Sequence, residues 1–271
     1  MTVLPDAALW LAGYLAIGAA VGFFAGMLGI GGGALMIPLL VWLFEAQGLP
    51  REHLLHLAVG TGMATILFTS VSSMRAHARR GAVRWDIVKR ITPGILAGGL
   101  AGSAIASSIP RFAFAVIFVV TVYGAALNIF LERKPNPSRT LPGRAGLFAV
   151  GAGISGLSAF AAVGGAFLTV PFMVWCNVPM LTAIGTAAAI GFPIAAAGSV
   201  GYVATGLTQP GLPAWSLGYV YLPALAGVTV ASMSLAPVGA LVAHRLPTKV
   251  LRRIFAVLMF TLATRMLITL W

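Results

Sequence analysis

The run Gly26-Met-Leu-Gly29-Ile-Gly-Gly-Gly33 decides the fold of this chain, because it interrupts an apolar segment that is too long for one membrane crossing. That segment spans residues 8–44. As a single helix at about 1.5 Å per residue it would be about 55 Å long, against ~30 Å for the hydrocarbon core of a bilayer. After the glycines, only about a dozen apolar residues remain, which is roughly half a crossing. We therefore predict a helix–break–helix hairpin that returns to the side from which it entered.

A second long apolar segment, residues 145–176, is interrupted in the same way by the small residues between Gly156 and Gly165. The break is followed by about half a crossing here as well. A broken helix inside a bilayer is tolerated only against protein or a water-filled cavity. The sequence therefore predicts two re-entrant hairpins that reach into the interior of the protein.

The composition excludes a water-soluble globular protein. The chain has 271 residues, of which 59% are hydrophobic and 8% are charged, with a mean hydropathy of +0.99. Soluble domains carry about 25% charged residues. Helices are expected in the apolar segments, since they lack the alternation of strands and lipid leaves no partner for an open backbone. The segments are 8–44, 54–74, 87–107, 111–131, 145–176, 181–205, 215–242 and 247–271.

Four short patterns in the first half of the chain recur in the same order in the second half. The matched pairs are Gly31-Gly32…Pro38 with Gly164-Gly165…Pro171, Val59-Gly60-Thr61 with Ile184-Gly185-Thr186, Pro93…Gly98 with Pro223…Gly227, and Ile109-Pro110 with Leu246-Pro247. Duplicated halves are common in secondary transporters. We predict a first transmembrane repeat at residues 1–131, a cytoplasmic linker rich in proline and charge at 132–144, and a second transmembrane repeat at 145–271.

The charges indicate a topology. The chain has 17 Lys and Arg against 5 Asp and Glu, a formal net charge of +12. If both broken segments are hairpins, 14 of the 17 basic residues share one side, whereas single crossings would divide them 11 against 6. The positive-inside rule favours the hairpins, with the second repeat inverted and both termini outside. This explanation of the positive charge requires no nucleic-acid partner.

The predicted fold is therefore an all-α polytopic protein of the cell (inner) membrane, built from two inverted repeats, each with a Gly-broken helical hairpin plus three transmembrane helices. The alternative is eight simple spans in two parallel repeats. The tryptophans fall at the predicted segment ends, as in an interfacial aromatic belt. They are Trp10, Trp42, Trp85, Trp175, Trp215 and Trp271.

The helix breaks are the strongest functional signal. A helix that restarts after a break presents free N–H groups and the positive end of its dipole, and can hold an anion without a buried lysine. Tight packing through small residues is the competing explanation for each glycine cluster. The residues that we expect at the substrate are Gly29, Gly31, Gly32, Gly33, Thr61, Ser155, Gly164, Gly165, Ala166 and Thr186.

The two threonines offer hydroxyl groups at matching repeat positions, although each could instead bond to the preceding turn of its own helix. His56 lies near the start of an apolar segment and is the candidate for proton coupling, with a plain hydrogen-bonding role as the alternative. A coupling proton or sodium ion, a small anion and the lipid bilayer are the expected partners. The sequence leaves the oligomeric state open.

Enzyme motifs are missing from the sequence: it has no Walker A loop, no His-Glu-x-x-His and no Gly-x-Ser-x-Gly. The single cysteine, Cys176, excludes an internal disulfide and a multi-cysteine metal site. We therefore expect no enzymatic activity, cofactor or metal site.

The residues around both breaks resemble the signature of the sulfite exporter (TauE/SafE-type) permease family. The resemblance rests on Ala25 to Gly33 with Pro38, Ile154-Ser155-Gly156 through Gly165 to Pro171, Val59-Gly60-Thr61, His77 to Val83, Pro237-Val-Gly239, and His244 to Pro247. It implies a transporter of sulfite, organosulfonates or related small organic acids, often working outward. The second break departs from the family pattern, because Ser158 to Val163 replaces a compact glycine turn. A passive anion channel is the alternative function, and a membrane-embedded enzyme or lipid-handling scaffold has the least support.

Overall fold

The computed structural model describes residues 3–28, 32–131, 138–162, 166–243 and 248–270, and most of these residues are helical. In chain order the helices are α1 (Val3–Leu28), α2 (Gly33–Ala46), α3 (Leu54–Arg79), α4 (Trp85–Ser108), α5 (Arg111–Leu131), α6 (Arg144–Ala161), α7 (Ala166–Trp175), α8 (Met180–Gly206), α9 (Leu222–Ala243) and α10 (Thr248–Leu270). Strands β1 (Ser216–Leu217) and β2 (Val220–Tyr221) pair antiparallel between α8 and α9.

Within the described residues, six helices are long and apolar enough to cross a membrane, judged by length and composition. Their spans are Ala7–Ala25, Leu54–Arg79, Trp85–Ser108, Arg111–Leu131, Arg144–Ala161 and Met180–Gly206. The prediction of an all-helical polytopic membrane protein is confirmed, since internal hydrogen bonding makes the helix the suitable spanning element for these apolar runs.

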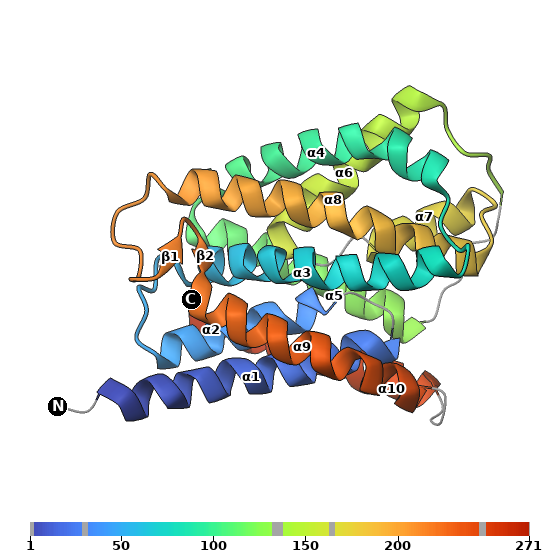
Figure 1. Ribbon diagram of the computed structural model, residues 1–271. Helices are drawn as coiled ribbons and strands as arrows, with labels where there is room; N and C mark the ends of the chain where they lie inside the picture. Colours follow the sequence, from blue (N-terminus) through green and yellow to red (C-terminus); the bar gives the residue numbers. More distant parts are fainter. Residues whose placement is uncertain (1–2, 29–31, 132–137, 163–165, 244–247, 271) are drawn as a thin grey trace.

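Both long apolar segments are broken helices. The short helices α2 and α7 turn back toward the end from which α1 and α6 start (Figure 1). The backbone N–H groups of Ser138 and Arg139, which precede α6, donate to the carbonyl oxygen of Trp175 at the end of α7, at 3.2 and 3.1 Å. In the first half, the hydroxyl of Tyr14 in α1 donates to Gln47, which follows α2. Neither broken segment forms one continuous helix.

Helices α1 and α6, which begin the two broken segments, run in opposite directions. Figure 1 shows that α1 leads away from the end that carries both chain termini, whereas α6 leads toward that end. The connection between α3 and α4 and the starts of α6 and α8 lie together at the other end. The described basic residues from Arg75 to Arg90 belong to that other end, while Arg111 begins α5 at the end with the termini.

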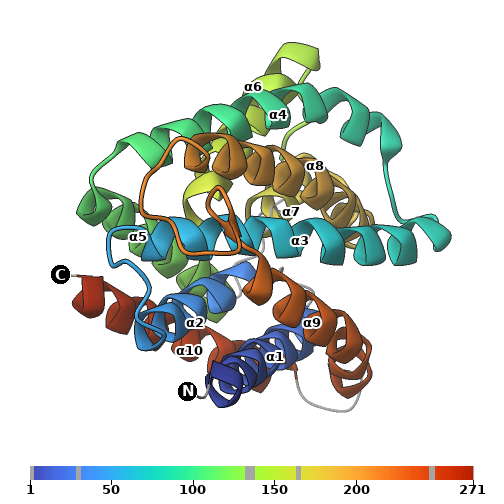
Figure 2. The same ribbon diagram turned by 60° about the vertical axis from the view of Figure 1, so that its left-hand side comes forward.

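Six of the described helices form three layers, each a pair with one helix from each half, and α5 packs on α10 as a further pair. The α4–α6 pair and the α1–α9 pair lie on opposite sides of the central α3–α8 pair (Figures 1 and 2). Glycines allow the outer pairs to pack backbone against backbone, as in small-residue motifs of membrane helices. A Cβ on Gly98 of α4 would lie 2.5 Å from Cα of Ala152 in α6, and one on Gly22 of α1 would lie 2.5 Å from Cα of Ser232 in α9.

One expected helix has a different start. Residues 215–242 were predicted as one apolar segment, but residues 216–221 form the β1–β2 hairpin and α9 begins only at Leu222. Gly218 has φ of 56° and allows the tight turn between the strands. Tyr219 and Val220 are buried. Protein covers the apolar residues from Tyr219 to Tyr221, which explains why this stretch resembles part of a spanning segment.

Candidate functional site at the helix breaks

The two helix breaks meet inside the molecule. A Cβ atom added to Gly33, the first residue of α2, would overlap the carbonyl oxygen of Ala162 and lie 2.8 Å from its carbonyl carbon. Ala162 follows α6 and has φ of 44°, a left-handed conformation that costs a non-glycine residue roughly 1 kcal/mol. Strained backbone in a packed interior is concentrated at functional sites. We call this contact between Gly33 and Ala162 the junction.

The start of α2 brings hydrogen-bond donors to the junction. Gly32 is the N-cap residue and makes no side-chain capping bond, and its carbonyl oxygen accepts bonds from Leu35 and Met36 at 3.3 and 3.0 Å. The first N–H groups of any helix have no acceptor within that helix. The aligned peptide dipoles add a partial positive charge at the same place. This helix terminus therefore has the chemistry to hold an anion.

Helix α3 passes beside the junction at a residue that the sequence analysis missed. A Cβ on Gly62 would lie 2.6 Å from Cδ1 of Ile37 and 3.6 Å from Cβ of Ala162. The absence of a side chain at Gly62 lets α2, α3 and the end of α6 converge. The sequence signal for this residue is its place directly after the repeated Val59-Gly60-Thr61 motif. Gly62 was not included in the predicted site.

The end of α6 is tied to α8. The hydroxyl of Tyr202 in α8 donates to the carbonyl oxygen of Ala159 at 2.7 Å, and the N–H of Ala162 donates to the carbonyl oxygen of Ser158 at 2.8 Å. Tyr202 is fully buried. Carbonyl groups in the last turn of a helix need such outside partners. No local sequence pattern links Tyr202 to the break, because the two are joined only by the fold.

The structure places the predicted glycine sites as follows. Gly32 and Gly33 lie at the junction. Ala166 begins α7 and packs against an apolar cluster that includes Ile87 of α4 and Met173 of α7. The predictions for Gly29, Gly31, Gly164 and Gly165 fall outside the described residues.

Ser155 lies away from the junction. It precedes Ala162 by seven positions in the sequence, which is about 10 Å along the axis of α6. The residue is 1% exposed and its hydroxyl has no hydrogen-bond partner within the described structure. A Cβ on Gly99 of α4 would lie 2.7 Å from that hydroxyl. Ser155 is therefore a buried polar group at the α4–α6 contact, where an unmade bond costs about 1–3 kcal/mol.

Thr61 and Thr186 bind backbone of the opposite half. The hydroxyl oxygen of Thr61 in α3 accepts the N–H of Tyr221, and that of Thr186 in α8 accepts the N–H of Arg84, each at 2.9 Å. Tyr221 immediately precedes α9 and Arg84 immediately precedes α4. Each threonine thus holds the start of a helix from the other half, and both are fully buried. Their direct contact with substrate stays a prediction.

The glycine before each threonine takes part in the same contact between the two halves. A Cβ on Gly60 would overlap the carbonyl group of Tyr219, and one on Gly185 would overlap that of Ala82. The repeated Gly-Thr pair is therefore a connector between the halves: the glycine admits a loop of the other half and the threonine binds it. Tight packing explains these two glycines fully.

His56 is buried in an aromatic setting. Its Nε2 lies 3.1 Å from the carbonyl oxygen of Ala106 in α4, and its ring stacks on Tyr219 at 4.9 Å between centroids and contacts Phe114 at 4.8 Å. A carbonyl oxygen only accepts, so Nε2 carries a hydrogen and Nδ1 holds a lone pair when the ring is neutral. Nδ1 has no partner within the described atoms.

Arg84 and Asp86 form an ion pair before and within the first turn of α4. The guanidinium of Arg84 donates to both carboxylate oxygens of Asp86 at 2.8 and 2.6 Å, and this bonding raises the pKa of Arg84. Among the residues that the structure describes, no three or more His, Cys, Asp or Glu gather to hold a metal ion. The residues that meet at the junction, Gly33, Gly62 and Ala162, carry no charge.

Known proteins match this arrangement of paired breaks at the level of sequence. The family profile described as "Sulfite exporter TauE/SafE" matches residues 14–266. The chain belongs to the TauE/SafE family. The motifs around both breaks, which carried the resemblance, lie inside the matched range of this TauE/SafE member.

Several relatives of this TauE/SafE chain cover most of its length. A "Probable membrane transporter protein" of Haemophilus influenzae is 31% identical over 93% of this chain and 96% of its own. The "Probable membrane transporter protein YdhB" of Bacillus subtilis is 28% identical over 85% and 89%. A third, MJ0441 of Methanocaldococcus jannaschii, is 25% identical over 76% of each chain. No solved structure matches the chain.

Proposed function

We propose that this TauE/SafE protein is a secondary transporter of small anions, with sulfite, organosulfonates and related small organic acids as its substrate class. The observation that carries the proposal is the junction, where the start of α2 meets the end of the α6 break. Family membership and the names of the relatives support membrane transport as the activity, and the family description supports sulfite-like anions as substrates. They favour a transporter over an enzyme.

The chemistry of the junction supports binding of an oxyanion. Donor N–H groups at the start of α2 would bind the oxygens of the anion, with no lysine or arginine required. In the described state the carbonyl oxygen of Ala162 lies against Gly33. The substrate would enter as the two breaks part, and its oxygens would take the place of that carbonyl. Closing the breaks again would expel the anion.

The pairing of helices supports two inverted repeats and an alternating-access cycle. Equivalent helices make equivalent contacts, since α1 packs on α9 as α6 packs on α4, and α3 packs on α8. The α1–α9 and α4–α6 pairs would rock against each other across α3 and α8, opening the junction to one side at a time. The threonine connectors would keep the start of each moving helix attached during this motion.

The distribution of charge supports an orientation in the cell (inner) membrane. The end that carries the described arginines from Arg75 to Arg90 would face the cytoplasm, and both termini would lie outside. The basic excess then acts as a topology signal in the lipid bilayer, and we propose no nucleic-acid partner. Residues 132–144 would form the cytoplasmic linker between the repeats.

Transport of the anion would be coupled to a proton at Nδ1 of His56, with sodium as the other candidate ion. Tyr219 of the β hairpin stacks on this ring, His53 contacts Tyr219, and the carboxylate of Glu52 lies 3.6 Å from Nε2 of His53. In liposomes, an inward proton gradient should accelerate uptake by wild type and by His53→Gln. His56→Gln should lose that acceleration while retaining substrate exchange. Persistent acceleration in His56→Gln, or acceleration by sodium alone, would refute the assignment.

Reconstitution into liposomes tests the function itself. We expect saturable flux of radiolabelled sulfite or of a short organosulfonate, and trans-side substrate should drive counterflow. Flux that does not saturate and shows no counterflow would favour the passive anion channel. Absence of flux for both substrates, with correctly folded protein in the vesicles, would refute the substrate class.

A further inference from the structure

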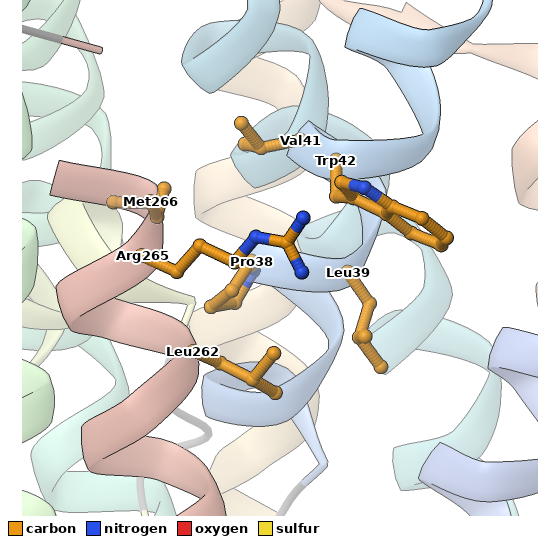
Figure 3. A pocket seen from close by; sticks show the side chains of 7 residues that line it. All are labelled: Pro38, Leu39, Val41, Trp42, Leu262, Arg265 and Met266. Atoms are coloured by element: carbon orange, nitrogen blue, oxygen red, sulfur yellow. The ribbon is translucent and has the colours of Figure 1, made fainter. Parts of the chain in front are cut away.

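A groove lies between α2 and α10. Figure 3 shows the side chains of both helices around it. Its lining residues are Pro38, Leu39, Val41, Trp42, Leu262, Arg265 and Met266. The groove encloses about 150 Å³, and an apolar cavity of about that size admits a group as large as benzene.

Arg265 is the one charged member of this lining, and its guanidinium lies 5.9 Å from the centroid of the Trp42 ring. Figure 3 shows the side chain extending from α10 toward α2 with Trp42 beside it. Arg265 is exposed, and no carboxylate pairs with it within the described part of the chain. A cation on the apolar face of a membrane protein is costly without a counterion.

The positions of Arg265 and Trp42 near the ends of their helices indicate that the groove lies at the depth of lipid headgroups. Arg265 precedes the end of α10 at Leu270 by five positions, and Trp42 precedes the end of α2 at Ala46 by four. These offsets place both residues about 6–8 Å from their helix ends. Tryptophan rings and long basic side chains prefer this level of a bilayer. Leu262 and Pro38 continue the lining deeper, where acyl chains lie.

We propose that this groove binds an anionic phospholipid, independently of the transported substrate. The phosphate would accept hydrogen bonds from the guanidinium of Arg265, and an acyl chain would lie along the apolar lining toward Leu262. Arginine presents a fork of donors that suits phosphate oxygens. The groove thus offers one positive head site and one apolar slot, which is the pattern of a single lipid.

A second copy of the chain fits the groove less well. It would have to supply a carboxylate at this depth, but the described carboxylates already have partners: Glu45 pairs with Arg51, Glu52 with His53 and Asp86 with Arg84. These three carboxylates are therefore not free to pair with Arg265 of another copy. Charge complementarity selects the phospholipid.

Native mass spectrometry of the detergent-purified full chain tests the proposal, with phosphatidylglycerol and phosphatidylcholine added separately. Wild type should retain phosphatidylglycerol more than phosphatidylcholine by about fivefold, as expected for one interfacial arginine. Arg265→Gln should lose this preference, and Arg111→Gln, which removes another arginine at the same end, should keep it. Leu262→Trp should fill the slot and reduce binding of both lipids.

The control measurements keep the result interpretable. Size-exclusion profiles and thermal midpoints without added lipid should match wild type for all three variants. An unchanged lipid preference in Arg265→Gln would overturn the proposal. A dimer that Leu262→Trp abolishes, together with equal retention of both lipids by wild type, would also overturn it and assign the groove to a second copy.

Discussion

The contact between Gly33 and Ala162 leads to a prediction for Gly33→Ala. The added methyl carbon would lie 2.8 Å from the carbonyl carbon of Ala162 and would overlap its oxygen. Carbon atoms normally pack about 3.5–4.0 Å apart, and the carbonyl oxygen lies closer still, so the two breaks would have to separate by roughly 1.5 Å to clear both atoms. Backbone atoms cannot rotate away as a flexible side chain can, and overpacking of this kind costs about 1–3 kcal/mol.

The cost falls on the closed junction and not on states in which the breaks have parted. A penalty of 1–3 kcal/mol changes such an equilibrium by about 5–150-fold. If every transport cycle passes through the closed junction, the initial rate of anion flux should fall by about fivefold or more. The assay is flux of labelled sulfite into liposomes, normalised to the amount of folded protein.

Gly124→Ala is the matched control, because Gly124 lies inside α5 with no atom within 4 Å of an added Cβ. Alanine there should leave flux unchanged and help the helix by about 1 kcal/mol. Wild-type flux in a folded Gly33→Ala protein would refute the assignment of the junction to the transport cycle. A loss of flux in Gly124→Ala as well would show that the assay reports general damage.

Three further predictions concern the connectors, the topology and the thiol. Thr186→Val should leave the N–H of Arg84 without its acceptor and lower the free energy of unfolding by about 1–3 kcal/mol, which lowers the thermal midpoint by roughly 2–4 °C per kcal/mol. The control Thr121→Val removes only a bond within α5 and should lower the midpoint less. Equal losses in the two variants would contradict the connector role. In a Cys176→Ser background, a membrane-impermeant maleimide should label Gln209→Cys in intact cells and Arg80→Cys only after lysis, and the reverse pattern would reject the proposed orientation. Burial raises the pKa of the native Cys176 thiol, and the charge of Arg139 partly offsets this rise. Less thiolate therefore forms at neutral pH, and alkylation of Cys176 should accelerate as the pH rises above the ordinary range for thiol ionisation. An alkylation rate that does not depend on pH would contradict this.

The sequence was sufficient to locate the helix breaks. Glycine runs inside apolar segments that are too long for one crossing leave few alternatives, because lipid offers no partners to an interrupted backbone. The structure accordingly ends α1 at Leu28 and α6 at Ala161, within the predicted small-residue stretches. The assignment to helical membrane proteins followed from the apolar composition, because a helix satisfies its own backbone hydrogen bonds in lipid.

The role of the repeated threonines could not be found in the sequence. The N–H groups that they bind lie 160 residues from Thr61 and 102 residues from Thr186, so no local spacing reveals them. The β1–β2 hairpin was missed for a related reason. The residues of β2 are buried against α3 and α8, and hydropathy does not distinguish burial in protein from burial in lipid.

The pairing of each outer helix with a helix from the other half has a consequence for biosynthesis. A ribosome that has completed α5 has made Gly22 and Gly98 but neither Ser232 nor Ala152, the residues that cover them. The nascent first half is therefore in the membrane with the glycine faces of α1 and α4 not yet packed against a partner helix. Closure of the fold depends on the last helices to be synthesised, and a chain truncated after residue 131 would present those faces to the proteases that remove incomplete membrane proteins. Supplying residues 138–271 as a separate chain would provide the missing partners.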